Sequence, residues 1–92
     1  MLIEFDAAKN DKNIRERGLS FERAADFDFS GSLVRKDVRA AYPEPRFVAI
    51  GHLEARLHVL CFTPTTAGIR VISFRKANRR EEKVYEQTFT HD

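Results

Sequence analysis

The sequence predicts an α+β fold: two N-terminal helices, an antiparallel β-meander of three to four strands, and a C-terminal helix. Helical and strand-like segments occupy separate stretches of the chain, which is typical of α+β folds. Short connections rich in turn-forming residues separate the apolar segments, which favours antiparallel neighbours. At 92 residues with 42% hydrophobic side chains, the chain is expected to form a single domain over residues 1–92.

The first helix is predicted from its capping residues. Residues 3–5 form a short extended piece, after which Asp6 caps a helix over about Ala7 to Arg17. Gly18 stands just past the expected end of this helix, where a residue in the left-handed conformation commonly terminates it.

A second, shorter helix from Phe21 to about Asp26 precedes a change to strand-like alternation. Extended segments are expected at residues 32–38, 46–53, 55–63 and 68–75. The segment 32–38 is the one that would give the meander four strands instead of three, and the two prolines of residues 41–45 mark a loop after it. The last segment leads into a helix from about Ala77 to Gln87.

Alternation along the strands makes a geometric prediction about two arginines. With odd-length turns in both hairpins, Arg46 would lie opposite Phe62, and Phe62 opposite Arg70. The two guanidinium groups would then share one face of the sheet, on either side of an aromatic ring. A change of one residue in either turn would separate them.

Positive charge is concentrated near the C-terminal end of the predicted meander. The net charge is +2, yet the first 69 residues carry equal numbers of acidic and basic side chains. The excess lies in residues 70–83, which contain Arg70, Arg75, Lys76, Arg79, Arg80 and Lys83. Cations are unfavourable at a helix start unless an anion lies opposite, and backbone amides there bind phosphate oxygens. The sequence therefore favours an anion site at the strand-to-helix junction; the open alternative is a solvated face balanced by Glu81 and Glu82.

Other features of the sequence argue against membrane proteins, secreted proteins and metal- or cofactor-dependent enzymes. No segment approaches the roughly 20 apolar residues of a membrane span, and the N-terminus has acids where a signal peptide needs basic residues. The one cysteine, Cys61, cannot form an internal disulfide, which suits a reducing cytoplasm. The three histidines show no metal-ligand spacing, and no glycine-rich phosphate loop or nucleophile motif is present. We therefore expect a soluble cytoplasmic protein without a metal or other cofactor.

Clustered arginines suit the cleavage of an RNA backbone. A guanidinium group pairs with two phosphate oxygens at once and stays charged at physiological pH. When the neighbouring 2′-hydroxyl attacks the phosphorus, fixed arginines stabilise the growing negative charge without a metal. Tyr42, Phe62 and Tyr85 are candidates for stacking a base, although aromatic residues more often belong to the core.

Four segments, in order, resemble the BrnT family of type II toxins. They are the first helix with Lys9 and Asn13, the turn of residues 18–21 (GLSF), residues 46–51 (RFVAIG) and residues 72–85 (ISFRKANRREEKVY). The resemblance runs from about Ile3 to Glu86. It implies a compact ribonuclease toxin whose fold is similar to the RelE group and which an antitoxin, BrnA, neutralises.

The resemblance also implies partners and site residues. BrnA carries a ribbon-helix-helix region that binds operator DNA, so the toxin would reach DNA only through the antitoxin, in an expected heterotetramer with two antitoxins. RNA would be the substrate. The residues implied for catalysis are Arg46, Arg70, Arg75 and Arg79, with further phosphate contacts from Lys9, Lys76 and Arg80. We also expect Arg17 and Tyr85 to contact the substrate.

Two positions depart from the family pattern. Phe5 stands where relatives commonly have tryptophan, which we expect to alter only packing. Arg17 stands where they commonly have histidine, and a guanidinium group cannot serve as a base. The proton could instead pass through His58, Lys9 or Glu4, so the general base and acid stay open. The alternatives are a catalytically weak or inactive module that binds an antitoxin or nucleic acid, and a structural subunit that docks on an acidic partner.

Overall fold

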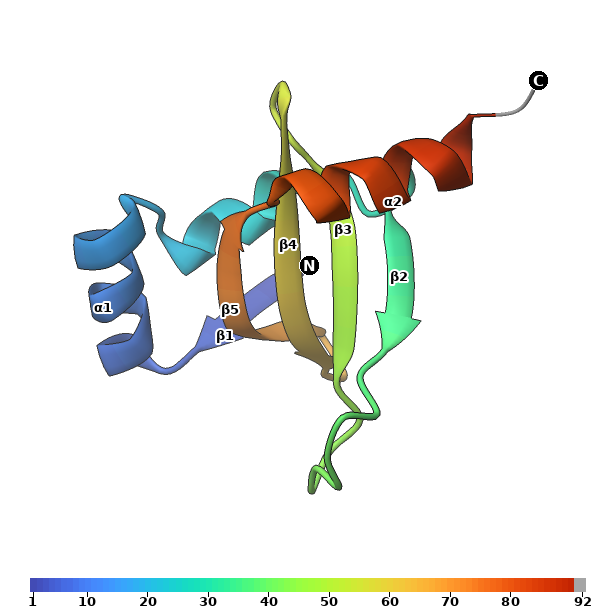
Figure 1. The fold of residues 1–92 in the computed structure, drawn as a ribbon. Helices are drawn as coiled ribbons and strands as arrows, with labels where there is room; N and C mark the ends of the chain where they lie inside the picture. The colour runs from blue at the N-terminus through green and yellow to red at the C-terminus, as the bar shows by residue number, and fades with distance from the viewer. Residues whose placement is uncertain (91–92) are drawn as a thin grey trace.

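The computed structural model describes residues 1–90, in which the strands form one five-stranded sheet (Figure 1). In chain order, the elements are β1 (Leu2–Phe5), α1 (Ala7–Arg17), the 3-10 helix η1 (Phe21–Asp26), β2 (Leu33–Lys36), β3 (Phe47–Leu53), β4 (Arg56–Pro64), β5 (Gly68–Lys76) and α2 (Arg79–Phe89). The strands lie in the order β1-β5-β4-β3-β2. β1 is parallel to β5 and the other neighbouring pairs are antiparallel, so the sheet is mixed.

The predicted fold of two N-terminal helices, a three- to four-stranded meander and a C-terminal helix is wrong. The sheet has five strands because the N-terminal segment, expected as an isolated extended piece, pairs with β5 from Leu2 opposite Gly68 to Phe5 opposite Val71. Pairing between opposite ends of the chain leaves no local signal in the sequence. The second predicted helix is a 3-10 helix of six residues, so one short α-helix lies near each end of the chain.

The bounds of α1 are the predicted ones, because both capping residues act as expected. The Asp6 carboxylate accepts a hydrogen bond from the backbone N–H of Lys9 (3.0 Å). Gly18 terminates the helix with φ 64°, a left-handed conformation that favours glycine. The only buried residues of α1 are Asn10 and Asn13, so polar contacts attach it to the rest of the fold. None of the helices in residues 1–90 has the length and apolar character needed to cross a membrane.

The strand register differs from the predicted one. The turn between β3 and β4 has two residues, 54–55, so Arg46 falls one position beyond the partner of Phe62. A register shift between β4 and β5, at which Ile72 has no register partner, then places Thr63 opposite Arg70. Continuing the β3–β4 register by one residue sets Arg46 beside Thr63. Arg46 and Arg70 therefore share a face of the sheet, with Thr63 rather than Phe62 between them.

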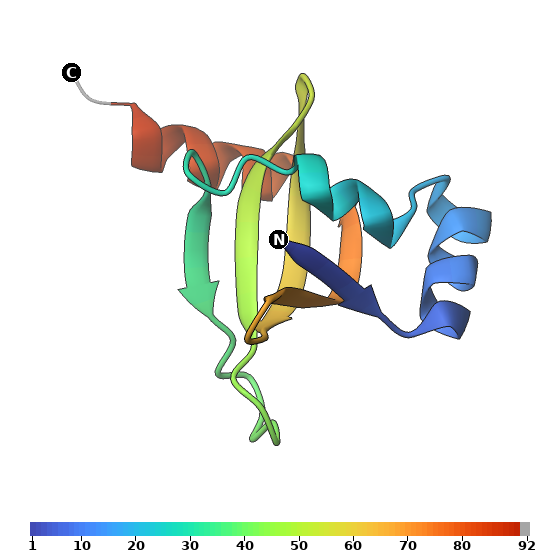
Figure 2. The same ribbon diagram turned by 180° about the vertical axis from the view of Figure 1, so that it is seen from behind.

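The two faces of the sheet are covered differently. One face carries the main core, in which η1 and its flanking residues pack on the strands through Phe21, Ala24, Phe27, Leu60, Phe62 and Phe74. Figure 2 shows η1 and β1 on this side. On the opposite face, α2 crosses β5, β4 and β3 (Figure 1) above a smaller cluster built around Leu57, Val59 and Ala77. α2 lies near the end of β3 and does not extend to the start of that strand.

Candidate functional site

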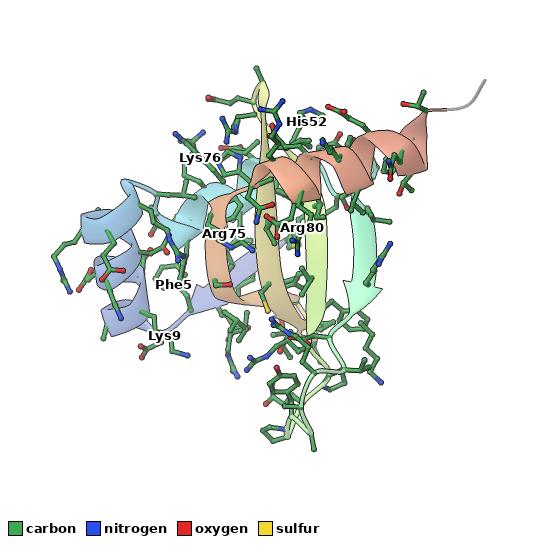
Figure 3. All side chains as sticks on the ribbon, in the orientation of Figure 1. Phe5, Lys9, His52, Arg75, Lys76 and Arg80 are labelled. Atoms are coloured by element: carbon green, nitrogen blue, oxygen red, sulfur yellow. The ribbon has the colours of Figure 1, made fainter. Side chains whose placement is uncertain are left out.

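A cleft of about 740 Å³ opens where the C-terminal end of α1, the β3–β4 turn and the end of β5 meet. Five basic side chains line it: Arg17, Arg23, Arg56, Arg75 and Lys76. The one acidic residue in its lining, Glu54, forms an ion pair with Arg23 at 3.2 Å. Figure 3 shows Lys76 and Arg75 extending from the same end of β5, whereas Lys9 lies at the far end of α1. The cleft therefore carries an excess of positive charge on four different elements, α1, η1, β4 and β5.

A buried asparagine holds the α1 side of the cleft in place. The side-chain amide of Asn13 donates to the carbonyl oxygens of Leu19 and Phe74, both at 2.9 Å, and so ties α1 to β5. The amide oxygen of Asn13 accepts a hydrogen bond from Arg17 at 2.9 Å, which orients the arginine. Because Phe74 belongs to the strand that ends in Lys76, this one side chain positions both walls of the cleft.

His58 is the side chain in the cleft that is best suited to move a proton. It is 5% exposed, and its Nδ1 lies 2.8 Å from the carbonyl oxygen of Arg56. A carbonyl oxygen only accepts, so Nδ1 carries the hydrogen and Nε2 keeps a free lone pair. Burial lowers the pKa of His58 below its ordinary value of 6.5, and the positive charges of Arg56 and Lys76 lower it further. The imidazole is therefore neutral and able to accept a proton at neutral pH.

The other two candidates for moving the proton lie elsewhere. Lys9 borders a separate, shallow depression between α1 and β5. Glu4 is on β1, where it is the register partner of Arg70. Of the three side chains that the sequence left open, only His58 lines the cleft.

Arg75, on β5, borders the cleft, but its guanidinium group is bound by a residue of α2. Its two terminal nitrogens donate to both carboxylate oxygens of Glu81, each at 2.8 Å. Glu81 also completes a capping box with Asn78 at the start of α2. The hydrogen bonds from Arg75 hold the pKa of Glu81 below its usual range. Arg75 therefore joins β5 to α2, and much of its hydrogen-bonding capacity is already used.

Arg46 and Arg70 lie on the α2-side face near the start of β3, outside the cleft. The Arg46 guanidinium stacks 4.0 Å above the ring of Tyr42, and its Nε is buried without a hydrogen-bond partner. Arg70 lies 3.6 Å from the carboxylate of Glu44, and both of these side chains are exposed. The loop before β3 thus supplies partners to both arginines.

The remaining predicted residues are dispersed. Arg79 borders a shallow depression on the outer side of α2, and Arg80 borders a groove beneath that helix. The hydroxyl of Tyr85 donates to the carbonyl oxygen of Gly31 at 2.7 Å, and its ring packs edge-on against His52. The structure thus brings Arg17, Arg75 and Lys76 together in one cleft and leaves Arg46, Arg70, Arg79, Arg80, Lys9 and Tyr85 outside it.

Two basic residues of the cleft, Arg23 and Arg56, were not singled out from the sequence. Arg56 directly follows the two-residue turn, and its guanidinium donates to the carbonyl oxygen of Ala77 at 3.2 Å. A correct assignment of that turn would have placed Arg56 beside the end of β5. No sequence signal connects Arg23, which lies on η1, with the other residues. Among residues 1–90, no three His, Cys, Asp or Glu side chains come together as a metal site would require.

Comparison with known families agrees with the resemblance seen in the sequence. A profile of BrnT, described as a ribonuclease toxin of a type II toxin–antitoxin system, matches residues 5–81. The matched part runs from the end of β1 into the first turn of α2 and includes the five basic residues of the cleft. No curated protein matches the sequence with significant similarity. Because the profile covers far more than half of the chain, the protein belongs to the BrnT family of ribonuclease toxins of type II toxin–antitoxin systems.

Proposed function

We propose that this chain is an endoribonuclease that cleaves RNA in the cleft by metal-independent transesterification. The family is one of ribonuclease toxins. The observation that carries the location and the mechanism is that a buried, neutral imidazole with a free Nε2 lines the same cleft as five basic side chains. A base and a set of fixed positive charges are what RNA cleavage by its own 2′-hydroxyl requires.

The proposed reaction begins when Nε2 of His58 takes the proton of a 2′-hydroxyl group. The 2′-oxygen then attacks the adjacent phosphorus and forms a new O–P bond, while the bond from phosphorus to the 5′-oxygen breaks. The products are a 2′,3′-cyclic phosphate and a 5′-hydroxyl group. Lys76 and Arg17 stabilise the extra negative charge of the transition state, and the Lys76 ammonium group supplies a proton to the departing 5′-oxygen.

Arg46 and Arg70 have a supporting role in this proposal. β5 carries Arg70 near its start and Lys76 at its end, so the two side chains are separated by roughly 20 Å along the strand. They would therefore contact phosphates several nucleotides apart rather than the same one. Such contacts hold the strand in place without taking part in the chemistry.

The partner is proposed from the family. Toxins of type II systems are paired with a protein antitoxin, and we propose a BrnA-like antitoxin with a ribbon-helix-helix region, two copies of which complete a heterotetramer. Operator DNA would be bound through the antitoxin. We place the activity in the cytoplasm, where the RNA is found and where the buried, free thiol of Cys61 stays reduced.

The first prediction tests the cleft with purified protein and a labelled single-stranded RNA. We expect cleavage to continue in EDTA and to leave 2′,3′-cyclic phosphate ends. Lys76→Ala is expected to lower the cleavage rate about 10²-fold, a usual loss for one fixed donor. Lys83→Ala removes an exposed lysine of α2 outside the cleft and should leave the rate unchanged.

Two outcomes would contradict this proposal in different ways. Cleavage that stops in EDTA and returns with added Mg²⁺ overturns metal independence. Equal rates for Lys76→Ala and the wild-type protein, with thermal melts that show both folded, overturn the assignment of the cleft.

A further inference from the structure

A groove of about 200 Å³ runs between α2 and the outer strands of the sheet. Its floor is aliphatic, formed by Leu33 of β2, Val48 and Ile50 of β3, and Val84 of α2. It shares no lining residue with the basic cleft. The groove is thus a separate surface, on the α2 side of the sheet.

Two arginines flank this aliphatic floor. Arg35 projects from β2 and Arg80 from α2; both are exposed, and neither forms an ion pair within residues 1–90. Figure 3 shows Arg80 extending from α2 over β3. Glu81 also lines the groove, but both of its carboxylate oxygens are held by Arg75. The groove therefore combines an apolar floor with two arginines that have no ion-pair partner within residues 1–90.

The groove lies beside an open edge of the sheet. β2 is the last strand of the sheet and, within residues 1–90, pairs only with β3, so its outer edge presents backbone N–H and C=O groups that no other strand of this part uses. Val34 on this strand is 45% exposed, and Val38 just after it is 79% exposed. An extended chain can add to such an edge by backbone hydrogen bonds, with side chains entering neighbouring pockets.

The chemistry of this surface favours one kind of occupant. Sites for single-stranded RNA use exposed aromatic rings to stack the bases, whereas this floor is wholly aliphatic. A second copy of the same edge would bring Arg35 and Lys36 of each chain together, and such like-charge pairs are unfavourable. Neither argument applies to an acidic protein segment. Its carboxylates can form ion pairs with the two arginines, and an apolar side chain of the segment can fill the groove.

We propose that the groove and the β2 edge form the docking site for an extended, acidic segment of a protein partner. An aliphatic side chain of the segment enters the groove, and carboxylates two positions before and after it pair with Arg35 and Arg80, since alternate residues of a strand point the same way. The inference rests on the proposed function only in taking the partner to be the antitoxin. A segment bound in the groove does not cover the basic cleft, so another part of the same partner would have to close the cleft.

The test uses ¹⁵N-labelled full-length protein and short synthetic peptides with the core Asp-Thr-Leu-Thr-Asp. We expect this peptide to shift the amide signals of Leu33, Arg35 and Val48 and to leave those of Gly18 and Lys76 unchanged. Replacing the peptide's leucine by alanine should weaken binding at least tenfold. Replacing its aspartates by lysines should abolish binding.

Variants of the protein separate docking from cleavage. Arg35→Glu and Arg80→Glu should each weaken the peptide at least tenfold, whereas Lys83→Glu, on the outer side of α2, should not. Arg35→Glu should still cleave RNA, and Lys76→Ala should still bind the peptide, so loss of one activity leaves the other measurable. Absence of shifts at the groove, or equal binding of the lysine peptide, would overturn the proposal. Shifts of the same amides by an oligouridine strand would reassign the groove to nucleic acid.

Discussion

At the scale of single residues, the chemistry of His58 follows from one hydrogen bond and from burial. The Arg56 carbonyl selects the tautomer, and the surrounding core removes the imidazole from water. Burial favours the neutral ring by lowering its pKa, and the hydrogen bond leaves Nε2 as the atom that accepts a proton. An exposed histidine would be partly protonated near pH 6.5 and would lose this ability there.

A second prediction concerns the pH dependence of His58. Its pKa is lowered in the folded protein, so between that value and 6.5 the unfolded chain binds more protons than the folded one. The free energy of unfolding is therefore expected to fall as the pH drops from about 6.5 towards the folded-state pKa. The cleavage rate should retain its neutral-pH value below pH 6.5, because the base stays unprotonated.

The measurement compares urea unfolding of the wild type and of His58→Gln across this pH range. The difference in unfolding free energy between the two should shrink as the pH falls, and the variant should lose most of its cleavage activity at pH 7. A rate profile whose acid limb lies at or above pH 6.5 would argue against His58 as the base.

The sequence could not predict those parts of the site that depend on tertiary contacts. Arg75 and Lys76 were marked by local charge, and the structure places both on the cleft. Asn13 was noted only for its spacing from Lys9, and nothing in the sequence indicated that its amide would join α1 to β5. Arg46 was expected in the same site, but it precedes β3 and so lies at the opposite end of that strand from the β3–β4 turn that borders the cleft.

At the scale of elements, the start of α2 shows how part of the charge of a basic run at a helix N-terminus is balanced by the helix itself. Arg79 and Arg80 occupy the first turn, where the helix dipole disfavours cations. Glu81 offsets this effect, because its carboxylate accepts hydrogen bonds from the backbone N–H of Asn78 (2.9 Å) and from Arg75. The solvated alternative considered from the sequence therefore describes part of this junction correctly.

The third prediction is that Glu81→Ala lowers the free energy of unfolding by about 2 kcal/mol, since it removes both half of a capping box and a partly buried ion pair. Glu81→Gln should lose less, because an amide oxygen can still accept from Asn78. Glu82→Ala is the matched control on the same turn and should change stability by less than about 0.5 kcal/mol. Urea unfolding at pH 7 measures all three; equal losses for the two alanine variants would contradict the role of Glu81.

The pH dependence of this ion pair also has a definite sign. The Glu81 carboxyl has a lowered pKa in the folded protein, so its contribution is present above the ordinary value of 4.5 and is lost as the pH falls below it. The His58 contribution begins to fall near pH 6.5, so a change in stability between pH 6.5 and 4.5 reports on His58 without Glu81.

Helices and strands that are marked by residues within or next to them, such as capping residues, were predicted well, and the other elements were not. α1 has a capping aspartate and a terminal glycine, and both of its predicted bounds are confirmed. α2 was expected from Ala77 but begins at Arg79, because Asn78 is its cap. The six-residue η1 is too short to show which helical geometry it adopts. The extended conformation at residues 3–5 was predicted, but the pairing of β1 was not, because its partner β5 lies near the other end of the chain.

At the scale of the whole molecule, β1 completes the sheet and gives β5 a neighbour on each side. β5 would otherwise be an open edge, and it is the strand that carries Arg70, Arg75 and Lys76. The parallel pairing is allowed by Gly68, whose position opposite Leu2 leaves no room for a side chain. The backbone N–H of Leu2 also donates to the carbonyl of Ala67 at 3.0 Å.

The last prediction concerns this close approach. A Cβ atom added at Gly68 would collide with the backbone nitrogen and oxygen of Leu2, so Gly68→Ala must displace β1. We expect a loss of about 3 kcal/mol in the free energy of unfolding, and faster hydrogen exchange at the β1 amides than in the wild type. Gly18→Ala is the matched control, because Gly18 has a left-handed φ of 64° but no atom within 4 Å of the added Cβ. It should lose only about 1 kcal/mol, from backbone strain alone. If the two variants lose the same stability and β1 exchanges normally in both, the close approach of β1 to Gly68 is not what holds this strand in the sheet.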